Sequence, residues 1–355
     1  MQNRVILFVA RHDGTDIRIN KEITTLINNN QYILTIVNGN INNQLYKREE
    51  ISTIELSYRF NSKFINLIYL YLVFTYVLVS NHRSIKNLHL VDEETIFVAI
   101  IGKLLRKTVV LDLFDSIALK FSNSSHWKRL IALCVSSVYK RIADCILYTD
   151  QSRLKLNSVK STSHKSIVLQ NYPTRSTLPV KLKNKKHDLL VSGTLYKDRG
   201  IDIILQNLDI FQKYDIAVLG WVKDSFAKRL IQLENVTYYG VVSAEDALDI
   251  SAQCRCNFIF YNPNNLNNIY ASPNKIYDSL ALGQMIWCNE ELNLLQDFAG
   301  NEYFFTTPYH DITNAPDLEN LIIDESIPSS KSPYFWENIE KNLLNAHGVS
   351  HYVET

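Results

Sequence analysis

The repeated alternation of short apolar runs with helix-type patterns limits most strongly what this chain can fold into. The β-branched and aromatic run at residues 5–10 is followed by a polar loop and by apolar residues at helical spacing from Ile17 to Ile27. Further apolar runs follow at residues 31–38 and 108–113. Strands that alternate with helices form parallel sheets, and ligands bind at the carboxyl ends of their strands. We therefore predict an α/β fold built on doubly wound sheets.

The length of the chain points to two domains. With 355 residues and 46% hydrophobic content, two domains of about 150 to 170 residues are expected. Residues 174–187 contain Pro179, the basic run KLKNKKH and few apolar side chains, which is typical of a linker. We predict Rossmann-like domains over residues 1–173 and 188–331, followed by a terminal segment over residues 332–355 that contains a helix.

Charge and cysteine content argue against several classes of function. The 37 basic and 36 acidic residues nearly cancel, so no global field attracts nucleic acid and we expect no nucleic-acid partner. The number of cysteines is odd, and Cys254 and Cys256 are too close together for a zinc site. The apolar run at residues 5–10 is too short for the core of a secretion signal. We therefore expect a reduced, cytoplasmic location.

Residues 270–286, YASPNKIYDSLALGQMI, have the composition of a capped helix. Ser272 and Pro273 are typical of an N-cap and a first-turn proline, and a glycine ends the pattern. A helix start presents unpaired backbone N–H groups and the positive end of the helix dipole, which together bind anions. Because Asn274 and Lys275 lie in this first turn, the stretch predicts a phosphate site.

Asp278 lies four residues after Asn274, on about the same face of this predicted helix. Its carboxylate can accept hydrogen bonds from a sugar diol such as a ribose. A diphosphate together with a ribose indicates a nucleotide. The alternative is an ordinary capped helix that packs Ile276, Leu280 and Leu282 into a core.

A second anion-binding pattern follows the predicted strand at residues 188–192. Gly193 and Thr194 predict a tight turn, and Arg199 and Gly200 precede an amphipathic segment. Glycine lets the backbone approach a phosphate, and a guanidinium group binds phosphate oxygens through two parallel hydrogen bonds.

Both patterns resemble the C-terminal domain of retaining, nucleotide-sugar-dependent glycosyltransferases of the GT-B type, in particular glycosyltransferase family 4. The family pattern is close to SPNK-[hydrophobic]-x-E-x-hydrophobic-A-x-G-x-P-V-I. The residues that match it are Ser272, Pro273, Asn274, Lys275, Asp278, Ala281, Gly283 and Ile286. Asp278 replaces the usual glutamate, and Tyr270 stands where many relatives have a second glutamate that contacts the sugar. The resemblance implies two Rossmann-like domains that face each other across a cleft.

By the same resemblance, the C-terminal domain holds the donor. The residues that it places around the nucleotide sugar are Gly193, Thr194, Lys197, Gly200, Gly240, Val242, Tyr270, Ser272, Pro273, Asn274 and Asp278. Arg199 and Lys275 would stabilise the charge on the departing diphosphate, so no metal is required. Thr194 replaces an arginine that is common in relatives, and this cationic contact is either missing or supplied by Lys197.

The resemblance assigns the acceptor to the N-terminal domain and folds the terminal helix, residues 332–346, back onto that domain. The residues that it implies on this side are Gly14, Asp16, Arg18 and Asp92, with Asp115 as a further catalytic carboxylate. Phe114 stands where relatives commonly have a histidine. The alternatives are a solvated or ion-paired surface position for Arg18 and a helix N-cap for Asp115.

Two segments of the N-terminal half raise the question of membrane contact. Residues 64–80 are almost wholly apolar, just under the length of about 20 residues that crosses a bilayer. A span would separate the first strand from its sheet, so a buried helix fits the fold better, and an interfacial helix is a third interpretation. Residues 126–143 are amphipathic with basic ends, which suits either a packed helix or docking on an anionic bilayer.

Together these features predict a glycosyltransferase that moves a sugar from a UDP- or GDP-linked donor to a glycan or lipid-linked acceptor. The family resemblance implies retention at the anomeric carbon, surface polysaccharide biosynthesis and possible peripheral contact with the inner membrane face. No cofactor is expected besides the nucleotide sugar. Two alternatives stay open. One is a nucleotide-sugar-binding or interaction protein that lost catalysis, suggested by Tyr270 and Phe114, and the other is a two-domain nucleotide-sugar epimerase.

Overall fold

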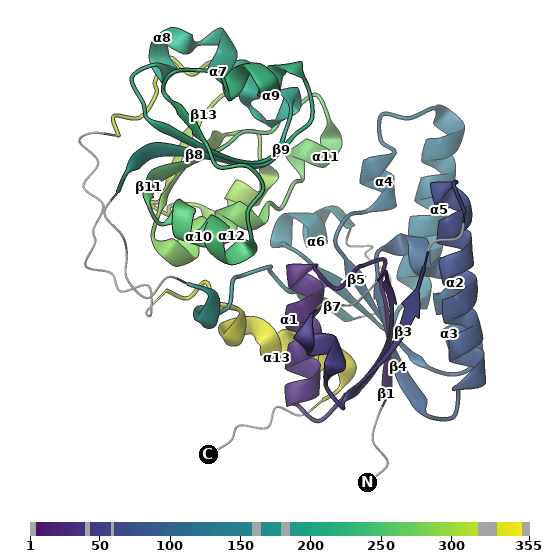
Figure 1. Ribbon diagram of the computed structural model, residues 1–355. Coiled ribbons are helices and arrows are strands. Elements are labelled where there is room, and N and C mark those ends of the chain that lie inside the picture. The colour runs from purple at the N-terminus through teal and green to yellow at the C-terminus, as the bar shows by residue number, and fades with distance from the viewer. Residues whose placement is uncertain are drawn as a thin grey trace. The chain divides into compact units, whose positions relative to one another are not determined.

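The computed structural model describes residues 5–39, 43–57, 60–157, 165–178, 185–318 and 332–349. The chain divides into two compact units, Met1–Gln170 with Ile339–Thr355, and Asn171–Asn338. Each unit contains one parallel sheet with helices on both faces (Figure 1). The predicted α/β fold with two Rossmann-like domains is therefore confirmed. Residues 179–184 of the predicted linker lie outside the described residues, as do residues 319–331 and 350–355.

The sheet of the first unit has seven strands. In spatial order they are β3 (Ile51–Leu56), β2 (Tyr32–Asn38), β1 (Val5–Val9), β4 (Ile85–Val91), β5 (Thr108–Leu113), β6 (Cys145–Tyr148) and β7 (Lys165–Val168). The helices are α1 (Ile17–Asn28), α2 (Lys63–Ser80), α3 (Ile96–Leu104), α4 (Ile117–Lys120), α5 (His126–Ile142), α6 (Gln151–Asn157) and most of α13 (Trp336–His347), with the 3-10 turns η1 (Gln44–Lys47) and η2 (Glu93–Thr95). The strand order reverses between β1 and β4, which is where ligands bind in such sheets.

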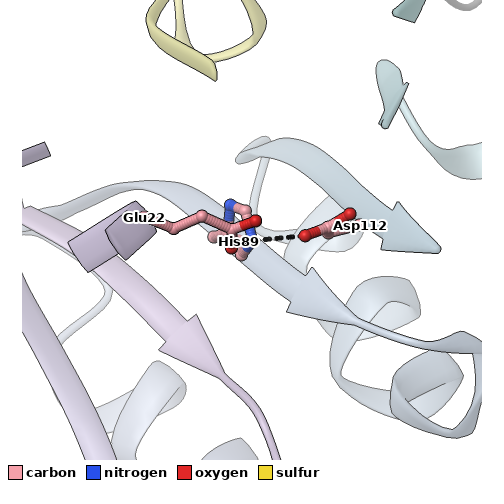
Figure 2. A group of neighbouring side chains, drawn as sticks. All are labelled: Glu22, His89 and Asp112. Carbon is pink, nitrogen blue, oxygen red and sulfur yellow. Dashed lines mark ion pairs between the residues drawn. The ribbon is translucent and has the colours of Figure 1, made fainter. Parts of the chain in front are cut away.

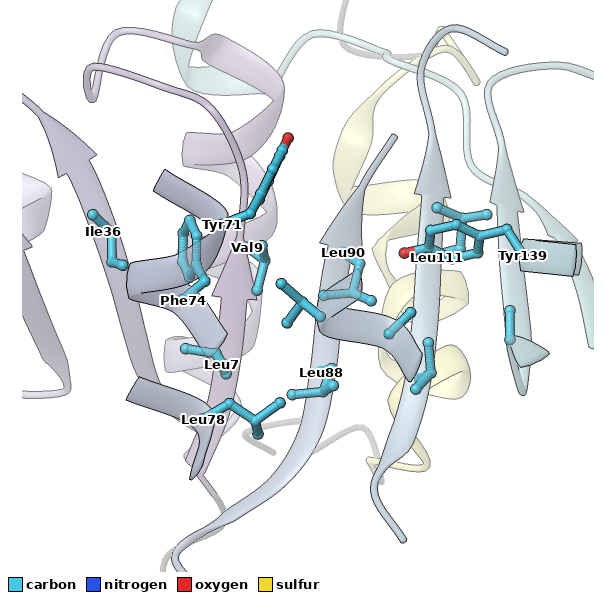
Figure 3. Close-up of a cluster of buried hydrophobic side chains, with 14 of the residues drawn as sticks. Leu7, Val9, Ile36, Tyr71, Phe74, Leu78, Leu88, Leu90, Leu111 and Tyr139 are labelled. Carbon is cyan, nitrogen blue, oxygen red and sulfur yellow. The ribbon is translucent and has the colours of Figure 1, made fainter. Parts of the chain in front are cut away.

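The main core of the first unit lies between its sheet and α2, α3 and α5 (Figure 3). Leu7, Leu88 and Leu111 come from three neighbouring strands and pack with Phe74 and Leu78 of α2, and all five side chains are fully buried. Each such side chain stabilises the fold by about 1.5–3 kcal/mol. This packing ties α2 to the sheet. Across the described part of the chain, no helix has both the length and the apolarity that a bilayer span requires.

Residues 339–347 of α13 pack against the first unit. Thr25 of α1 donates a 2.9 Å hydrogen bond to the Glu340 carboxylate. The side-chain amide of Asn342 donates to the Val168 carbonyl at the end of β7, at 3.1 Å. The C-terminal part of α13, as far as His347, therefore packs into the first unit.

The sheet of the second unit has six strands. In spatial order they are β10 (Val236–Tyr238), β9 (Ile216–Val222), β8 (His187–Leu195), β11 (Cys254–Ile259), β12 (Met285–Asn289) and β13 (Phe304–Thr307). The helices are α7 (Ile201–Gln206), α8 (Leu208–Phe211), α9 (Ser225–Leu230), α10 (Ala244–Ser251), α11 (Leu266–Ile269) and α12 (Asn274–Leu282), with the turns η3 (Arg175–Thr177), η4 (Lys197–Arg199) and η5 (Asn293–Phe298). In Figure 1, α7, α8 and α9 lie on one face of this sheet and α10 and α12 on the other. Here the strand order reverses between β8 and β11.

Several predicted element boundaries were wrong. Gly193 does not form a tight turn, because β8 continues through it to Leu195. The strand β11 begins at Cys254, before the apolar run at residues 258–261, and β7 ends at Val168, although apolar residues continue to Tyr172. The strand β3 was not predicted, because its sequence ISTIEL mixes polar and apolar residues and its outer positions are exposed.

Candidate functional site

The two sequence patterns that predict anion binding meet at the carboxyl ends of β8 and β11. Arg199 ends the turn η4 just after β8, and Lys275 is the second residue of α12. The Arg199 Cζ atom lies 3.9 Å from the ring centroid of Tyr261, which follows β11, and the Lys275 Nζ atom lies 5.6 Å from that centroid. The structure therefore brings both predicted cations together at the strand-order reversal, where doubly wound sheets bind ligands.

The Arg199 guanidinium is held in place but is not fully bonded. Its Nε atom donates a 2.9 Å hydrogen bond to the Tyr196 hydroxyl, and its planar face stacks on Tyr261. Its Nη1 atom is buried and has no hydrogen-bond partner among the described residues. An unsatisfied buried donor costs about 1–3 kcal/mol, and more when it is charged. An anionic ligand at this position would supply the missing acceptor.

Lys275 has an environment that also favours an anion. Its Nζ atom donates to the Ser192 carbonyl at 3.1 Å. Burial, and to a smaller extent the positive charge of Arg199, lowers the pKa of the Lys275 ammonium group to about 7. Both effects disfavour the charged lysine, and a neighbouring negative charge would reverse them. A diphosphate bound between the two side chains would therefore restore the full charge of Lys275.

Three glycines lie in the backbone near Arg199 and Lys275. Gly193 has a φ of +100° and pairs with Gly220 of β9, and nothing lies within 4 Å of the position that a Gly193 Cβ would take. A Cβ at Gly220 would collide with the Gly193 carbonyl, so the two strands can approach this closely only through glycine. Gly200, at φ +77°, is confined in the same way by Phe258 and Phe260. The open side of Gly193 is suited to a close approach by a phosphate.

Thr194 and Lys197 lie close to this pair in the sequence. Both residues are exposed. The Lys197 Nζ atom lies 5.4 Å from the ring centroid of Phe226, and the Lys197 backbone N–H donates to the Asp224 carboxylate at 2.8 Å. Lys197 is thus oriented toward α9, and its contribution of the cation that Thr194 lacks stays a prediction.

The remaining residues predicted to hold the nucleotide lie along the same sheet edge and the start of α12. The Gly240 carbonyl accepts a 2.7 Å hydrogen bond from Gly220 N–H, which ties the turn after β10 to β9. Val242 is half-buried against a small apolar cluster that includes Leu190. Tyr270 is half-buried at the end of α11.

The start of α12 differs from the predicted cap. Pro273 occupies the N-cap position, and Ser272, predicted as the cap, instead has its hydroxyl 2.7 Å from the Tyr277 hydroxyl. The cap shifts by one residue because Pro273 has an extended ψ of 129° that precedes the helix. Asn274 is exposed and accepts from the Asn171 side-chain amide at 2.8 Å, while Asp278 is half-buried one turn later. The predicted glycine end of this helix, Gly283, is confirmed at φ +63°.

On the first unit, Gly14 and Asp16 have structural contacts. The Gly14 carbonyl accepts from the side-chain amides of Asn20 and Asn43, each at 3.0 Å. Asp16 caps α1 by accepting the Ile19 N–H at 3.0 Å. Their part in acceptor binding stays a prediction.

Arg18 is not the surface residue that one interpretation of the sequence suggested. It is 4% exposed and donates to both carboxylate oxygens of Asp112, at 2.8 and 3.1 Å. It also forms a 2.9 Å ion pair with Glu22 and donates to the Leu169 carbonyl at 2.9 Å. Burial explains this pairing, because a guanidinium away from water needs carboxylate partners. Arg18 therefore belongs to an internal network, which does not favour its predicted role on the acceptor side.

The same network contains a group of side chains that could hold a metal ion, Glu22, His89 and Asp112 (Figure 2). The His89 Nε2 atom lies 3.2 Å from Glu22 and 3.9 Å from Asp112, and its Nδ1 atom lies 3.0 Å from Nε2 of His347. Burial raises the pKa of both carboxyl groups and lowers the pKa of His89 to about 4. Because Arg18 already bridges both carboxylates, a metal ion would have to compete with its guanidinium, and the geometry favours an ion-pair network. Sequence analysis missed this group because its members come from α1, β4 and β5 without any spacing motif.

Asp92 lies at the end of β4, beside the strand-order reversal of the first sheet. Its φ is +59°, a strained value for a residue with a side chain. Its carboxylate accepts from the Asp115 N–H at 2.9 Å and lies 3.3 Å from Lys120 Nζ. Burial raises the pKa of Asp92 to about 6. A carboxyl group with this pKa can exchange a proton near neutral pH, as acid–base catalysis requires.

Asp115 is close to Asp92 and more exposed. Its side chain is 43% exposed, and one carboxylate oxygen lies 3.4 Å from the Arg153 guanidinium. The alternative that Asp115 caps a helix was wrong, because α4 begins at Ile117 and Ser116 holds the N-cap position. The structure thus brings the two predicted acids of the first unit together.

Comparisons with known proteins agree on the fold. No protein-family profile matches the chain, and no curated protein matches it in sequence. Sucrose-phosphate synthase from Thermosynechococcus elongatus superimposes with a TM-score of 0.69 at 13% identity and 98% coverage of both chains. HepE from Anabaena, solved with UDP and glucose, gives 0.63 at 12% identity, covering 96% of this chain and 95% of that one. UDP-GlcNAc 2-epimerase from Methanocaldococcus jannaschii gives 0.60 at 10% identity, covering 99% and 100%. These likenesses establish the GT-B fold, which transferases and epimerases share.

Proposed function

We propose that this chain is a glycosyltransferase that uses a UDP- or GDP-linked sugar as its donor. The observation that carries the proposal is the buried Arg199 Nη1 atom, which has no hydrogen-bond partner in the described chain and lies beside Lys275. A diphosphate offers the acceptor oxygens and the negative charge that this pair lacks. The predicted ribose contact of Asp278, one helical turn after Asn274, fits the same ligand.

The proposed chemistry breaks the bond between the anomeric carbon and the donor phosphate oxygen. Negative charge then builds up on the departing diphosphate, where Arg199 and Lys275 stabilise it. In this scheme the charge stabilisation comes from side chains and needs no metal. The resemblance to retaining enzymes leads us to propose that the anomeric configuration is kept.

For the acceptor side we propose Asp92 and Asp115 of the first unit. The acceptor hydroxyl must lose its proton as the new glycosidic bond forms, and a carboxylate with a pKa of about 6, such as Asp92, can take up a proton near neutral pH. We propose a glycan or lipid-linked acceptor, in surface polysaccharide biosynthesis on the cytoplasmic side of a membrane.

A thermal-shift screen tests the donor site. The purified chain is heated with UDP, GDP, CMP and ADP and with their sugar conjugates. A ligand at about a hundred times its dissociation constant adds about 2.7 kcal/mol to the free energy of unfolding. We expect one diphosphate to stabilise the chain selectively and the effect to be lost in Arg199→Ala and Asp278→Ala. A uniform lack of response would contradict the donor site.

A nucleotide-sugar epimerase is the second candidate, because the epimerase neighbour covers essentially the whole chain. Incubation of the bound donor without an acceptor separates the possibilities. An epimerase converts the donor sugar to its isomer, and a transferase releases nucleoside diphosphate slowly by hydrolysis. A chain that binds the donor and changes neither the sugar nor the diphosphate would be a binding protein of the same fold.

A further inference from the structure

Three helices of the first unit form one continuous apolar surface. The helix α3 packs between α2 and α5 on one face of the sheet (Figure 1). More than half of the exposed large apolar side chains in the described part of the chain lie on these three helices. The most exposed are Phe64, Leu72, Tyr76, Phe97, Leu104, Trp127 and Ile131, each between 62% and 74% exposed. We call this surface the α2–α3–α5 face.

The exposed apolar side chains of this face are separate from those that pack the core. Leu70, Phe74 and Leu78 already fill the sheet side of α2 and are fully buried. Leu72 and Tyr76 lie on the opposite side of the same helix, so α2 is apolar all round although only one side is covered. A surface helix normally carries polar residues on its outer side, and a large exposed apolar patch marks an interaction site.

The charges on the face have one sign. The sequences of α2, α3 and α5 contain no aspartate or glutamate, whereas they contain lysines and arginines near their ends. Lys128 and Arg129 are exposed next to Trp127, and Arg141 is exposed at the other end of α5. Trp, Tyr and Phe side chains beside basic residues are typical of surfaces that lie in the headgroup region of a bilayer.

We propose that the α2–α3–α5 face docks on a membrane surface that contains anionic lipids. The apolar side chains would enter the boundary between headgroups and acyl chains, while Lys128, Arg129 and Arg141 would meet the lipid phosphates. The chain lies on the membrane and does not cross it, because the sheet side of α2 is part of the protein core. This inference goes beyond sugar transfer and is independent of whether the donor site is correct.

A second copy of the chain is a poorer occupant for reasons of charge. A symmetric dimer brings the same patch of both subunits together. The basic residues of both copies would then lie in one interface, and the three helices carry no acidic side chain that could compensate them. Anionic lipid supplies the complementary charge.

Vesicle flotation of the full chain tests the proposal. One set of vesicles contains phosphatidylcholine alone, and the other contains equal amounts of phosphatidylcholine and phosphatidylglycerol. We expect the protein to float with the anionic vesicles, to bind the neutral ones much more weakly and to be released by salt. Cys134 is exposed on α5, while the other four cysteines are buried. An environment-sensitive dye on Cys134 should therefore report transfer of this face into an apolar medium.

Two double variants and two matched controls separate the apolar and charged contributions. Leu104→Gln with Trp127→Gln removes two apolar contacts and should weaken vesicle binding by at least roughly tenfold. Lys128→Glu with Arg129→Glu should weaken binding to anionic vesicles by a similar factor. Leu208→Gln, on exposed α8, and Lys228→Glu with Arg229→Glu, on exposed α9, should bind as the unmodified chain does. All altered side chains are exposed, so thermal unfolding should be unchanged.

The proposal is overturned if the chain ignores both kinds of vesicle. It is equally overturned if binding is the same with neutral and anionic lipid, or if the control variants lose binding as the face variants do. Concentration-dependent dimers that Leu104→Gln with Trp127→Gln dissociates, without vesicle binding, would assign the face to a second copy. Donor stabilisation in the thermal-shift screen is read separately, so failure of one proposal is not mistaken for failure of the other.

Discussion

Arg18 and Arg199 each follow the first strand of their sheet, but their surroundings are opposite. Arg18 is bonded to Asp112, Glu22 and the Leu169 carbonyl. Arg199 has a tyrosine hydroxyl, an aromatic face and a buried Nη1 atom without a partner in the described chain. A buried cation that the chain neutralises supports the fold, whereas one that the chain leaves unsatisfied is available to a ligand. The comparison predicts which arginine matters for stability and which for function.

Removal of the carboxylate opposite Arg18 should have the largest effect. Asp112→Ala leaves a buried guanidinium without its main counter-charge and should lower the free energy of unfolding by about 3–5 kcal/mol. Urea denaturation measures this loss. The control is Asp215→Ala, whose ion pair with His187 is half-exposed and should cost at most about 1 kcal/mol. Equal losses in the two variants would show that Arg18 does not depend on Asp112.

Removal of the unsatisfied arginine should affect turnover instead. Arg199→Ala should lower kcat by about two orders of magnitude or more, because one charge-stabilising contact to the leaving group is lost. Its free energy of unfolding should fall much less than that of Asp112→Ala, because Arg199 loses only the Tyr196 hydrogen bond and the Tyr261 contact, and no counter-charge in the described chain is left unpaired. Assays with the donor found in the screen measure turnover, and Arg229→Ala on exposed α9 is the control. Near-normal turnover would remove Arg199 from the mechanism.

Stability should depend on pH through buried histidines of the first unit. Burial lowers the pKa of His12 to about 4, and its ring contacts only the hydroxyls of Thr35 and Tyr46 among the described polar groups. A lowered folded-state pKa means that the unfolded chain binds the proton first, so stability is present above pH 6.5 and is lost as pH falls toward 4. Between pH 7 and pH 5 the expected loss is about 2 kcal/mol for this residue.

Urea denaturation at the two pH values measures this loss, and His12→Gln should reduce the difference because it removes the titrating ring. If His12→Gln has the same pH dependence as the unmodified chain, other groups are responsible.

Donor affinity should fall as pH rises above neutrality. Lys275 has a pKa of about 7 in the free protein, and a bound diphosphate raises it, so binding above pH 7 requires proton uptake. The dissociation constant for UDP-glucose or GDP-mannose, whose diphosphates do not titrate in this range, should rise by up to about tenfold for each pH unit above 7. Calorimetry in buffers of different ionisation enthalpy measures the proton uptake. Lys275→Met should bind more weakly at neutral pH and show no such dependence, and a pH-independent unmodified chain would contradict a lysine–diphosphate contact.

Much of the fold and part of the candidate site could be predicted from residue patterns. The apolar runs predict most strands, because a strand buried on both faces has a continuous apolar sequence. They do not predict β3, whose exposed positions interrupt the apolar pattern. Arg199 and Lys275 could be predicted as site residues because glycine, proline and helix-start residues surround them. The local conformations that these residues favour can be read from the sequence. Tyr261, which stacks on Arg199, carried no local signal beyond its position after a strand.

The sequence by itself determined the alternation of strands and helices, the apolar helices α2, α3 and α5, and the residue types that predict a diphosphate site. Only the tertiary structure decided that Arg18 is neutralised and Arg199 is not. Whether a charge is satisfied depends on side chains that strands distant in sequence bring within hydrogen-bond distance, such as Asp112 for Arg18. The tertiary structure also placed one side of α2 in the core and left the other exposed, because hydrophobic periodicity records apolar character and not which neighbour covers it.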